Sequence, residues 1–159
     1  MGLYLAGMAY SLRVASGPND FALLWPPAGV AFAAVVRYGL RWVLFVPVAL
    51  LLDYALRRDV PESFLLISIL ANTVAPLAAG WIVRRRPRPE FPEFRSGLLM
   101  LMGGILLAII GALIGTTGML FSGMVNKSQL VDAMLRWMMG DLLGVIAVTP
   151  APMLFAYRN

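Results

Sequence analysis

The chemically most informative segment of the chain runs from Trp137 to Gly144 and places Asp141 at the edge of a long apolar stretch. Gly140 precedes this aspartate and Gly144 follows it, so backbone or a ligand can approach closely. A carboxylate in apolar surroundings is costly unless something uses or neutralises it. Two interpretations follow. Asp141 contacts a ligand, proton or cation inside a helical bundle, or it caps the start of a helix, a position that Asp favours.

Asn72 lies well inside another apolar stretch, next to Thr73. Pro76 follows four residues later and has no N–H to donate to the Asn72 carbonyl. Irregular backbone at membrane depth is tolerated where it is buried in protein or lines a cavity. The Asn72 side chain is therefore expected either to hydrogen-bond to a neighbouring helix or to form a pocket wall.

Asp53 is a further candidate for ligand or signal sensing. It precedes Arg57 by four residues, a spacing that favours an ion pair along one helix face. The same carboxylate can extend toward the membrane surface. The ion pair is the preferred interpretation of this residue.

Catalytic chemistry has no support in the sequence. The chain contains no Cys and no His, which removes thiol catalysis, disulfides and the usual zinc and haem ligands. No phosphate loop, nucleophile–base pair or carboxylate dyad is present. We therefore expect no enzymatic activity, no catalytic residue, no metal site and no cofactor.

The composition defines the class of protein that positions these residues. Of 159 residues, 60% are hydrophobic and only 13% are charged, which indicates an integral membrane protein. The formal net charge is +5, but the basic residues stand at the ends of apolar stretches rather than on one face with aromatics. That distribution favours contact with membrane lipid and argues against nucleic-acid binding.

We predict a single all-α domain over residues 1–159, a polytopic transmembrane helical bundle of about six spans. Pro47, Pro76 and Pro150 lie inside predicted spans, where each frees a carbonyl and can kink its helix. The predicted spans are residues 1–14, 22–36, 42–56, 63–83, 97–121 and 138–156.

The distribution of basic residues predicts the orientation in the membrane. Eight of the 13 Lys and Arg residues fall on the side of the loops after the second and fourth spans, including Arg84, Arg85 and Arg86. The positive-inside rule then places this side, and both termini, in the cytoplasm.

Small residues recur along the fifth span at alternating steps of four and three. Such a stripe lets a neighbouring helix pack closely, and its partner lies either within the chain or in a second copy, as a homodimer. The stripe consists of Gly104, Ala108, Gly111, Gly115 and Gly118.

Several motifs, taken in order along the chain, resemble the first class of bacterial membrane-associated sensor domains. Trp25-Pro26-Pro27-Ala28-Gly29 opens the second span and Asn72-Thr73 lies in the fourth, which closes with residues 80–85. Trp137-x-x-Gly140-Asp141-x-x-Gly144 follows, with Pro150 downstream. The resemblance extends over roughly residues 10–157.

The resemblance implies a domain of the bacterial inner membrane that stands N-terminal to a diguanylate cyclase, phosphodiesterase or histidine kinase. Members of this family usually continue through about two more spans, so the chain is expected to be the front portion of a longer sensor, a standalone relative, or the ordered part of a longer product. The sensing candidates are Trp25, Asn72, Asp141 and Asp53. A stimulus would act near them and be relayed to a cytoplasmic output domain or partner.

Two other functions compete with signal sensing. A structural or accessory subunit of a larger membrane complex fits the short length and the glycine stripe. A small transporter is the third alternative, which weak internal repeat symmetry and few buried charges disfavour.

Overall fold

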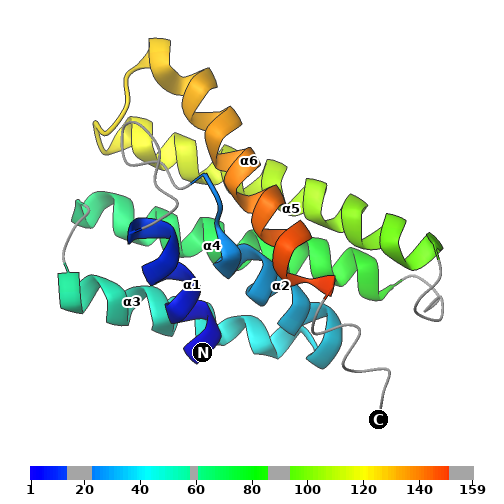
Figure 1. Cartoon of the computed structure of the whole chain (residues 1–159). Coiled ribbons are helices and arrows are strands. Elements are labelled where there is room, and N and C mark those ends of the chain that lie inside the picture. Colours follow the sequence, from blue (N-terminus) through cyan, green and yellow to red (C-terminus); the bar gives the residue numbers. More distant parts are fainter. Residues whose placement is uncertain (14–22, 58–60, 86–93, 151–159) are drawn as a thin grey trace.

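A computed structural model describes residues 1–13, 23–57, 61–85 and 94–150 of the chain. All regular structure in these ranges is helical, which confirms the predicted all-α bundle (Figure 1). The helices are α1 (Gly2–Arg13), α2 (Pro26–Tyr38), the 3₁₀ helix η2 (Leu40–Leu44), α3 (Phe45–Arg57), α4 (Glu62–Arg84), α5 (Phe94–Phe121), the 3₁₀ helix η3 (Lys127–Gln129) and α6 (Leu130–Val148).

Helix α2 has clear start and stop signals. Pro26 and Pro27 occupy its first turn, where their fixed backbone angle is compatible with a helix and their missing N–H groups are not needed. Gly39 ends the helix with φ 114°, a backbone angle that residues other than glycine rarely adopt. Its N–H donates to the Val35 carbonyl at 3.0 Å. The chain then turns directly into η2.

The helices that pack against one another have defined relative directions. Helices α2 and α4 run in the same direction. Trp25, at the start of α2, bonds to Asn72 in the middle of α4. Arg84, at the end of α4, donates to the carbonyl of Val36 near the end of α2. Helix α5 is antiparallel to α4. Gly103, early in α5, lies beside Val83 near the end of α4, and Gly118, late in α5, lies beside Ile67 near the start of α4.

Helix α6 closes the bundle between α5 and α2. It runs antiparallel to α5, whose Gly104 faces Val145 and whose Gly115 faces Trp137. Helices α2, α4, α5 and α6 therefore form the central group, and α1 and α3 pack on the side of α2 and α4 (Figure 1).

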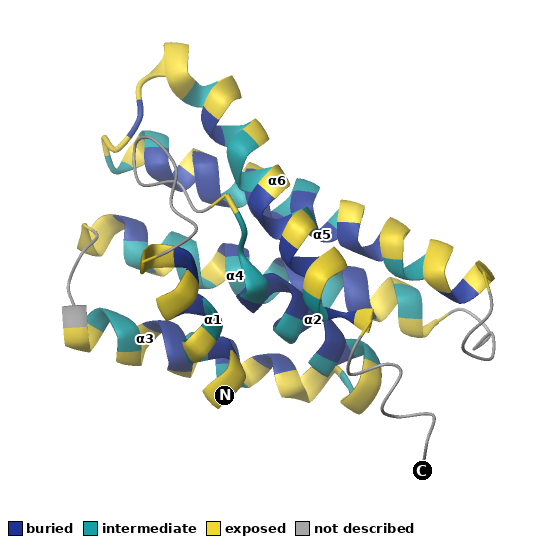
Figure 2. Cartoon of the chain, in the orientation of Figure 1, coloured by how far each residue is buried: buried dark blue, intermediate teal, exposed yellow. Residues whose placement is uncertain are grey.

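Residues buried between these helices, dark blue in Figure 2, form clusters. One cluster joins α1, α2, η2 and α3 and includes Tyr4, Val35 and Val46. A second joins α2, α4, α5 and α6 around Phe32, which is fully buried, and Leu107. Trp25, one of the sensing candidates, packs against both clusters.

The small-residue stripe of α5 lies inside the chain. All five of its members are buried. A Cβ on Gly118 would meet the side chain of Ile67 from α4, and one on Gly104 would meet Val145 from α6. Two helices of the same chain therefore occupy the stripe, so close packing there needs no second copy.

Two described helices, α4 with 23 residues and α5 with 28, are long and apolar enough to cross a membrane. Helix α1, with 12 residues, spans about 18 Å at the usual rise, which is shorter than a hydrocarbon core of about 30 Å. Large apolar side chains such as Leu66, Leu113 and Ile146 are exposed on the outside of the bundle, as lipid contact requires. The count of six spans stays a prediction.

Helix α6 begins at Leu130, earlier than the predicted start at residue 138. Asn126 provides the start signal: its side chain accepts from the N–H groups of Ser128 and Gln129, while Gln129 Oε1 accepts from the Asn126 N–H. The polar residues before position 138 lie on an exposed helix face, where Arg136 Nε donates to Asp132 Oδ2 at 2.7 Å.

The three prolines of the predicted spans occupy different positions. Pro76 lies inside α4. Pro47 lies in the first turn of α3, directly after η2, and Pro150 follows the end of α6 at Val148. Of these three, Pro76 is the one that removes a hydrogen bond from a helix interior.

Candidate polar site between four helices

Trp25 joins the start of α2 to two other helices. Its backbone N–H donates to the Gly140 carbonyl of α6 at 2.9 Å. Its indole Nε1 donates to Asn72 Oδ1 of α4 at 3.1 Å. Both donors of this residue are therefore satisfied by helices that are far away in the sequence.

Asn72 is held in one orientation by two hydrogen bonds. While Oδ1 accepts from Trp25, Nδ2 donates to the Ser68 carbonyl one turn earlier at 2.9 Å. Its own carbonyl lacks the usual partner four residues on, because Pro76 has no N–H. The interhelical hydrogen bond expected of Asn72 is present, with the indole of Trp25 as its donor.

Asp141 lies in the interior of α6 and is only 4% exposed. Its Oδ2 accepts from the Nε1 of Trp137, one turn earlier, at 3.1 Å. The helix-capping interpretation is wrong, because α6 begins at Leu130 and carries Asp141 well past its first turn. The residue is a buried carboxylate inside the bundle.

Glycines allow the close approach of helices around Asp141. A Cβ on Gly111 of α5 would come within 2.7 Å of Asp141 Oδ2. A Cβ on Gly144 would collide with the Trp25 carbonyl, and one on Gly29 would collide with the Gly144 carbonyl. The glycines of the Trp25–Gly29 and Trp137–Gly144 motifs therefore form the crossing of α2 and α6.

Asp53 lies on α3 and is partly buried. The predicted pairing with Arg57 involves a side chain outside the described residues. The structure brings Trp25 into direct contact with Asn72 and with the glycines that flank Asp141. No contact in the described part of the chain joins Asp53 to these three candidates.

One residue of the site was not among the sensing candidates. Trp137 contributes the hydrogen bond to Asp141 and lays its ring against Gly115. Its spacing four residues before Asp141 already places the two residues on one helix face. Tyr4, on α1, packs in the cluster that contacts Trp25; it is 1% exposed and its hydroxyl has no hydrogen-bond partner.

The chemistry available here is that of a binding site. It comprises one carboxylate, one amide and two indoles where α2, α4 and α6 meet. Within the described residues no group of three or more His, Cys, Asp and Glu side chains is placed to hold a metal ion. An ionisable residue inside a membrane bundle is by default a candidate for a functional position, which makes Asp141 the first candidate here.

Comparison with known proteins identifies the family. The model of the MASE1 family matches residues 1–159, the full length of the chain. No curated protein and no solved structure matches it. The chain belongs to the MASE1 family, membrane-associated sensor domains that stand N-terminal to signalling domains.

Proposed function

We propose that the chain is a multi-pass sensor domain of the bacterial inner membrane that relays a stimulus to a cytoplasmic signalling module. The stimulus acts on the site formed by Trp25, Asn72 and Asp141, and Asp53 contributes from α3. Membership of a membrane sensor family supports the general role in sensing. The residues and the relay are our proposal.

The observation that carries the proposal is the double attachment of Trp25. One residue at the start of α2 bonds to α4 through its indole and to α6 through its backbone. A stimulus that changes either contact must change how α6 packs on α2 and α4. Packed interfaces tend to switch between discrete arrangements rather than deform smoothly, so such a change can be transmitted along a helix.

Helix α6 is the proposed relay. It carries Asp141 near its middle, and its last turn reaches Gly29 of α2, whose carbonyl accepts from Thr149 Oγ1 at 3.4 Å. That end of α6 lies on the same side of the bundle as the ends of α2 and α4, where Arg84 and Arg85 stand. The positive-inside rule assigns this side to the cytoplasm.

The test uses the full-length gene product with its own signalling module. Substitutions Trp25→Phe, Asn72→Leu and Asp141→Asn are introduced singly, and the activity of the module is measured in membranes at equal protein abundance. Each change is expected to shift basal output or abolish its response. Trp42→Phe is the matched control, because Trp42 is 48% exposed and lies in η2. Output that ignores all three substitutions contradicts the proposal.

The accessory-subunit alternative rested in part on a glycine stripe available to another protein. Side chains of α4 and α6 fill that stripe, which removes this support. Purification in mild detergent distinguishes the two functions. A stoichiometric complex with unrelated membrane subunits would favour the accessory role.

A further inference from the structure

Arginine side chains gather where α2 and α4 end side by side. Arg84, in the last turn of α4, directs its guanidinium group to the end of α2, and its Nη1 donates to the Val36 carbonyl at 2.6 Å. A Cβ on Gly39, the residue that ends α2, would lie 3.9 Å from Arg84 Nη2. A positive charge close to the last carbonyls of a helix is favourable. Arg84 thus joins the ends of the two helices.

This contact leaves most of the Arg84 donors unused. A guanidinium group carries several N–H donors in a fixed planar fork. In the described part of the chain, Arg84 bonds to the carbonyls of Val35 and Val36, both through Nη1, and to no carboxylate. The residue is also exposed. A guanidinium group that is fixed on one side and open on the other is suited to bind a phosphate group.

Two further arginines lie beside Arg84, and each is placed over an exposed aromatic ring. Arg85 lies 3.7 Å from the centroid of Trp81, and Arg37 lies 5.5 Å from that of Tyr38. Arg85 is the next residue of α4, and Arg37 follows the carbonyl that Arg84 bonds. The attraction between a cation and a ring restrains the side chain but does not neutralise its charge. Three positive charges are therefore held close together.

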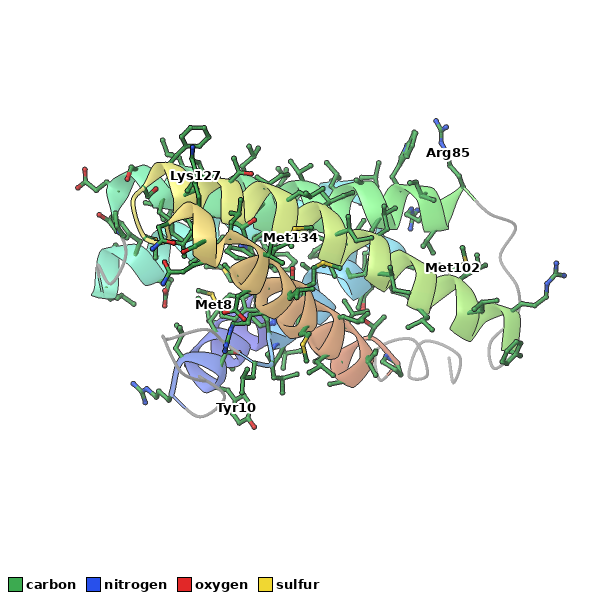
Figure 3. All side chains as sticks on the ribbon, turned by 90° about the horizontal axis from the view of Figure 1, so that it is seen from above. Met8, Tyr10, Arg85, Met102, Lys127 and Met134 are labelled. Atoms are coloured by element: carbon green, nitrogen blue, oxygen red, sulfur yellow. The ribbon has the colours of Figure 1, made fainter. Side chains whose placement is uncertain are left out.

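No carboxylate in the described ranges balances this charge. Glu62 stands in the first turn of α4, at the far end of that helix. Asp132 pairs with Arg136 near the start of α6, and Asp141 lies inside the same helix. Arg85 lies at the opposite end of the bundle from Lys127 (Figure 3). A concentration of like charge at one end attracts an anion.

The apolar side chains around the arginines indicate what kind of anion fits. Tyr38 is 58% exposed and Trp81 is 42% exposed, and Leu40 and Ile82 beside them are exposed as well. Aromatic rings of membrane proteins are enriched at the level of the lipid head groups, and apolar side chains face the lipid tails. A soluble phosphate would contact only the guanidinium groups. A phospholipid matches both parts of this surface.

We propose that Arg84, Arg85 and Arg37 bind the head-group phosphate of an anionic phospholipid at the joined ends of α2 and α4. Basic pockets at the ends of membrane-spanning helices are suited to acidic head groups. A zwitterionic lipid binds less well, because its ammonium group is repelled by the arginines. The site lies at the end of α2 opposite to Trp25, so the inference does not depend on the proposed function.

Binding is tested on the complete chain purified in a neutral detergent. Phosphatidylglycerol and phosphatidylcholine with the same acyl chains are titrated separately, and native mass spectrometry counts the lipid molecules that the protein retains. We expect phosphatidylglycerol to saturate with an apparent affinity at least about tenfold higher than that of phosphatidylcholine. Glycerol 3-phosphate, which has the phosphate but no acyl chain, is added as a competitor and is expected not to displace the lipid at equal concentration.

The variants define which residues hold the head group. Arg84→Gln and Arg85→Gln are each expected to weaken phosphatidylglycerol binding about tenfold, the loss expected for a hydrogen bond to a charged group. Lys127→Gln is the matched control, since it removes the same charge at the other end of the bundle. Circular dichroism verifies that each variant retains its helices. Arg85→Gln is informative even if Arg84→Gln unfolds, because the Arg85 side chain contacts a ring of its own helix.

Four results would overturn the inference. They are equal affinity for the two lipids, unchanged phosphatidylglycerol affinity in Arg85→Gln, an equal loss of affinity in Lys127→Gln, and displacement of the lipid by glycerol 3-phosphate. An equal loss in the control would mean that net charge attracts the lipid, and displacement would mean that the occupant is a soluble anion. Lipid binding is measured without a signalling module, so its failure is distinguishable from failure of the proposed relay.

Discussion

Trp25 is the residue on which the site depends most. Its backbone and indole N–H groups need hydrogen-bond acceptors, and water is not available to them inside a bundle. Other helices provide both acceptors. The Trp25–Asn72 pair also has a geometric requirement, because Asn72 is already oriented by its bond to Ser68. A single residue thus fixes where α2 begins relative to α4 and α6.

A double-mutant cycle on Trp25→Phe and Asn72→Leu measures this hydrogen bond. Each single variant removes one partner, and the double variant removes both, so the coupling free energy isolates the pair. Interhelical side-chain hydrogen bonds in membrane proteins contribute about 0.6 kcal/mol on average and up to about 1.7 kcal/mol. We expect a coupling within this range, from reversible unfolding in mixed detergent micelles. A coupling of zero would show that the indole and the amide do not interact.

At the scale of elements, α5 serves as the surface on which α4 and α6 are placed. Its glycines accept side chains from the two helices in turn: Ile67 at Gly118, Trp137 at Gly115 and Val145 at Gly104. Trp137 also donates a hydrogen bond to Asp141. The close contact between its ring and Gly115 therefore helps to fix the position of the Asp141 carboxylate. The small residues of α5 therefore position the site without contributing a polar group to it.

Gly115→Ala is expected to lower the stability of the bundle by about 1–3 kcal/mol, the usual consequence of overpacking. The new methyl group would overlap the ring of Trp137, which is too rigid to move aside without shifting α6. Thermal unfolding followed by circular dichroism measures the effect.

Gly97→Ala is the control for the same helix. A Cβ at Gly97 meets no atom within 4 Å, so the substitution adds helix propensity without a clash and raises stability by up to about 1 kcal/mol. Equal melting temperatures for Gly115→Ala and Gly97→Ala would contradict the packing of Trp137 against α5.

For the molecule as a whole, the directions of the helices separate two ends with different character. At one end, Arg84 donates to the carbonyl of Val36 at 2.6 Å, and Arg85 lies over the ring of Trp81 at 3.7 Å. The 3₁₀ helix η3, which contains Lys127, follows the C-terminal end of α5 and lies at the other end of the bundle (Figure 3). Arginine beside tryptophan is typical of the boundary between lipid tails and head groups.

The orientation in the membrane is testable because the chain has no cysteine. Lys127→Cys and Arg85→Cys introduce single thiols at exposed positions on the two ends. A membrane-impermeant maleimide is expected to label Lys127→Cys in intact spheroplasts and Arg85→Cys only after permeabilisation, since the positive-inside rule predicts that the arginine-rich end faces the cytoplasm. The reverse pattern would invert the proposed topology, and labelling of both thiols in intact cells would contradict a membrane-spanning arrangement.

The sequence by itself determined the class of the protein, the family and most helices. These follow from local properties of the sequence: its apolar composition, the prolines at the start of α2, Gly39 at its end, and short motifs that can be recognised without knowledge of the fold. The helix α6 extends upstream of the predicted span at 138, to Leu130, because Asp132 and Arg136 pair on its exposed face. Apolar composition locates a span but not the end of a helix that continues into a polar segment.

Only the tertiary structure decided what surrounds each candidate residue. Asp141 lies inside α6 because the capping signal stands upstream at Asn126, and its neighbour Gly111 comes from another helix. The partner of the glycine stripe was equally open until α4 and α6 were seen to fill it. Burial and contact depend on residues that meet across helices, and a single sequence records which groups exist but not which of them meet.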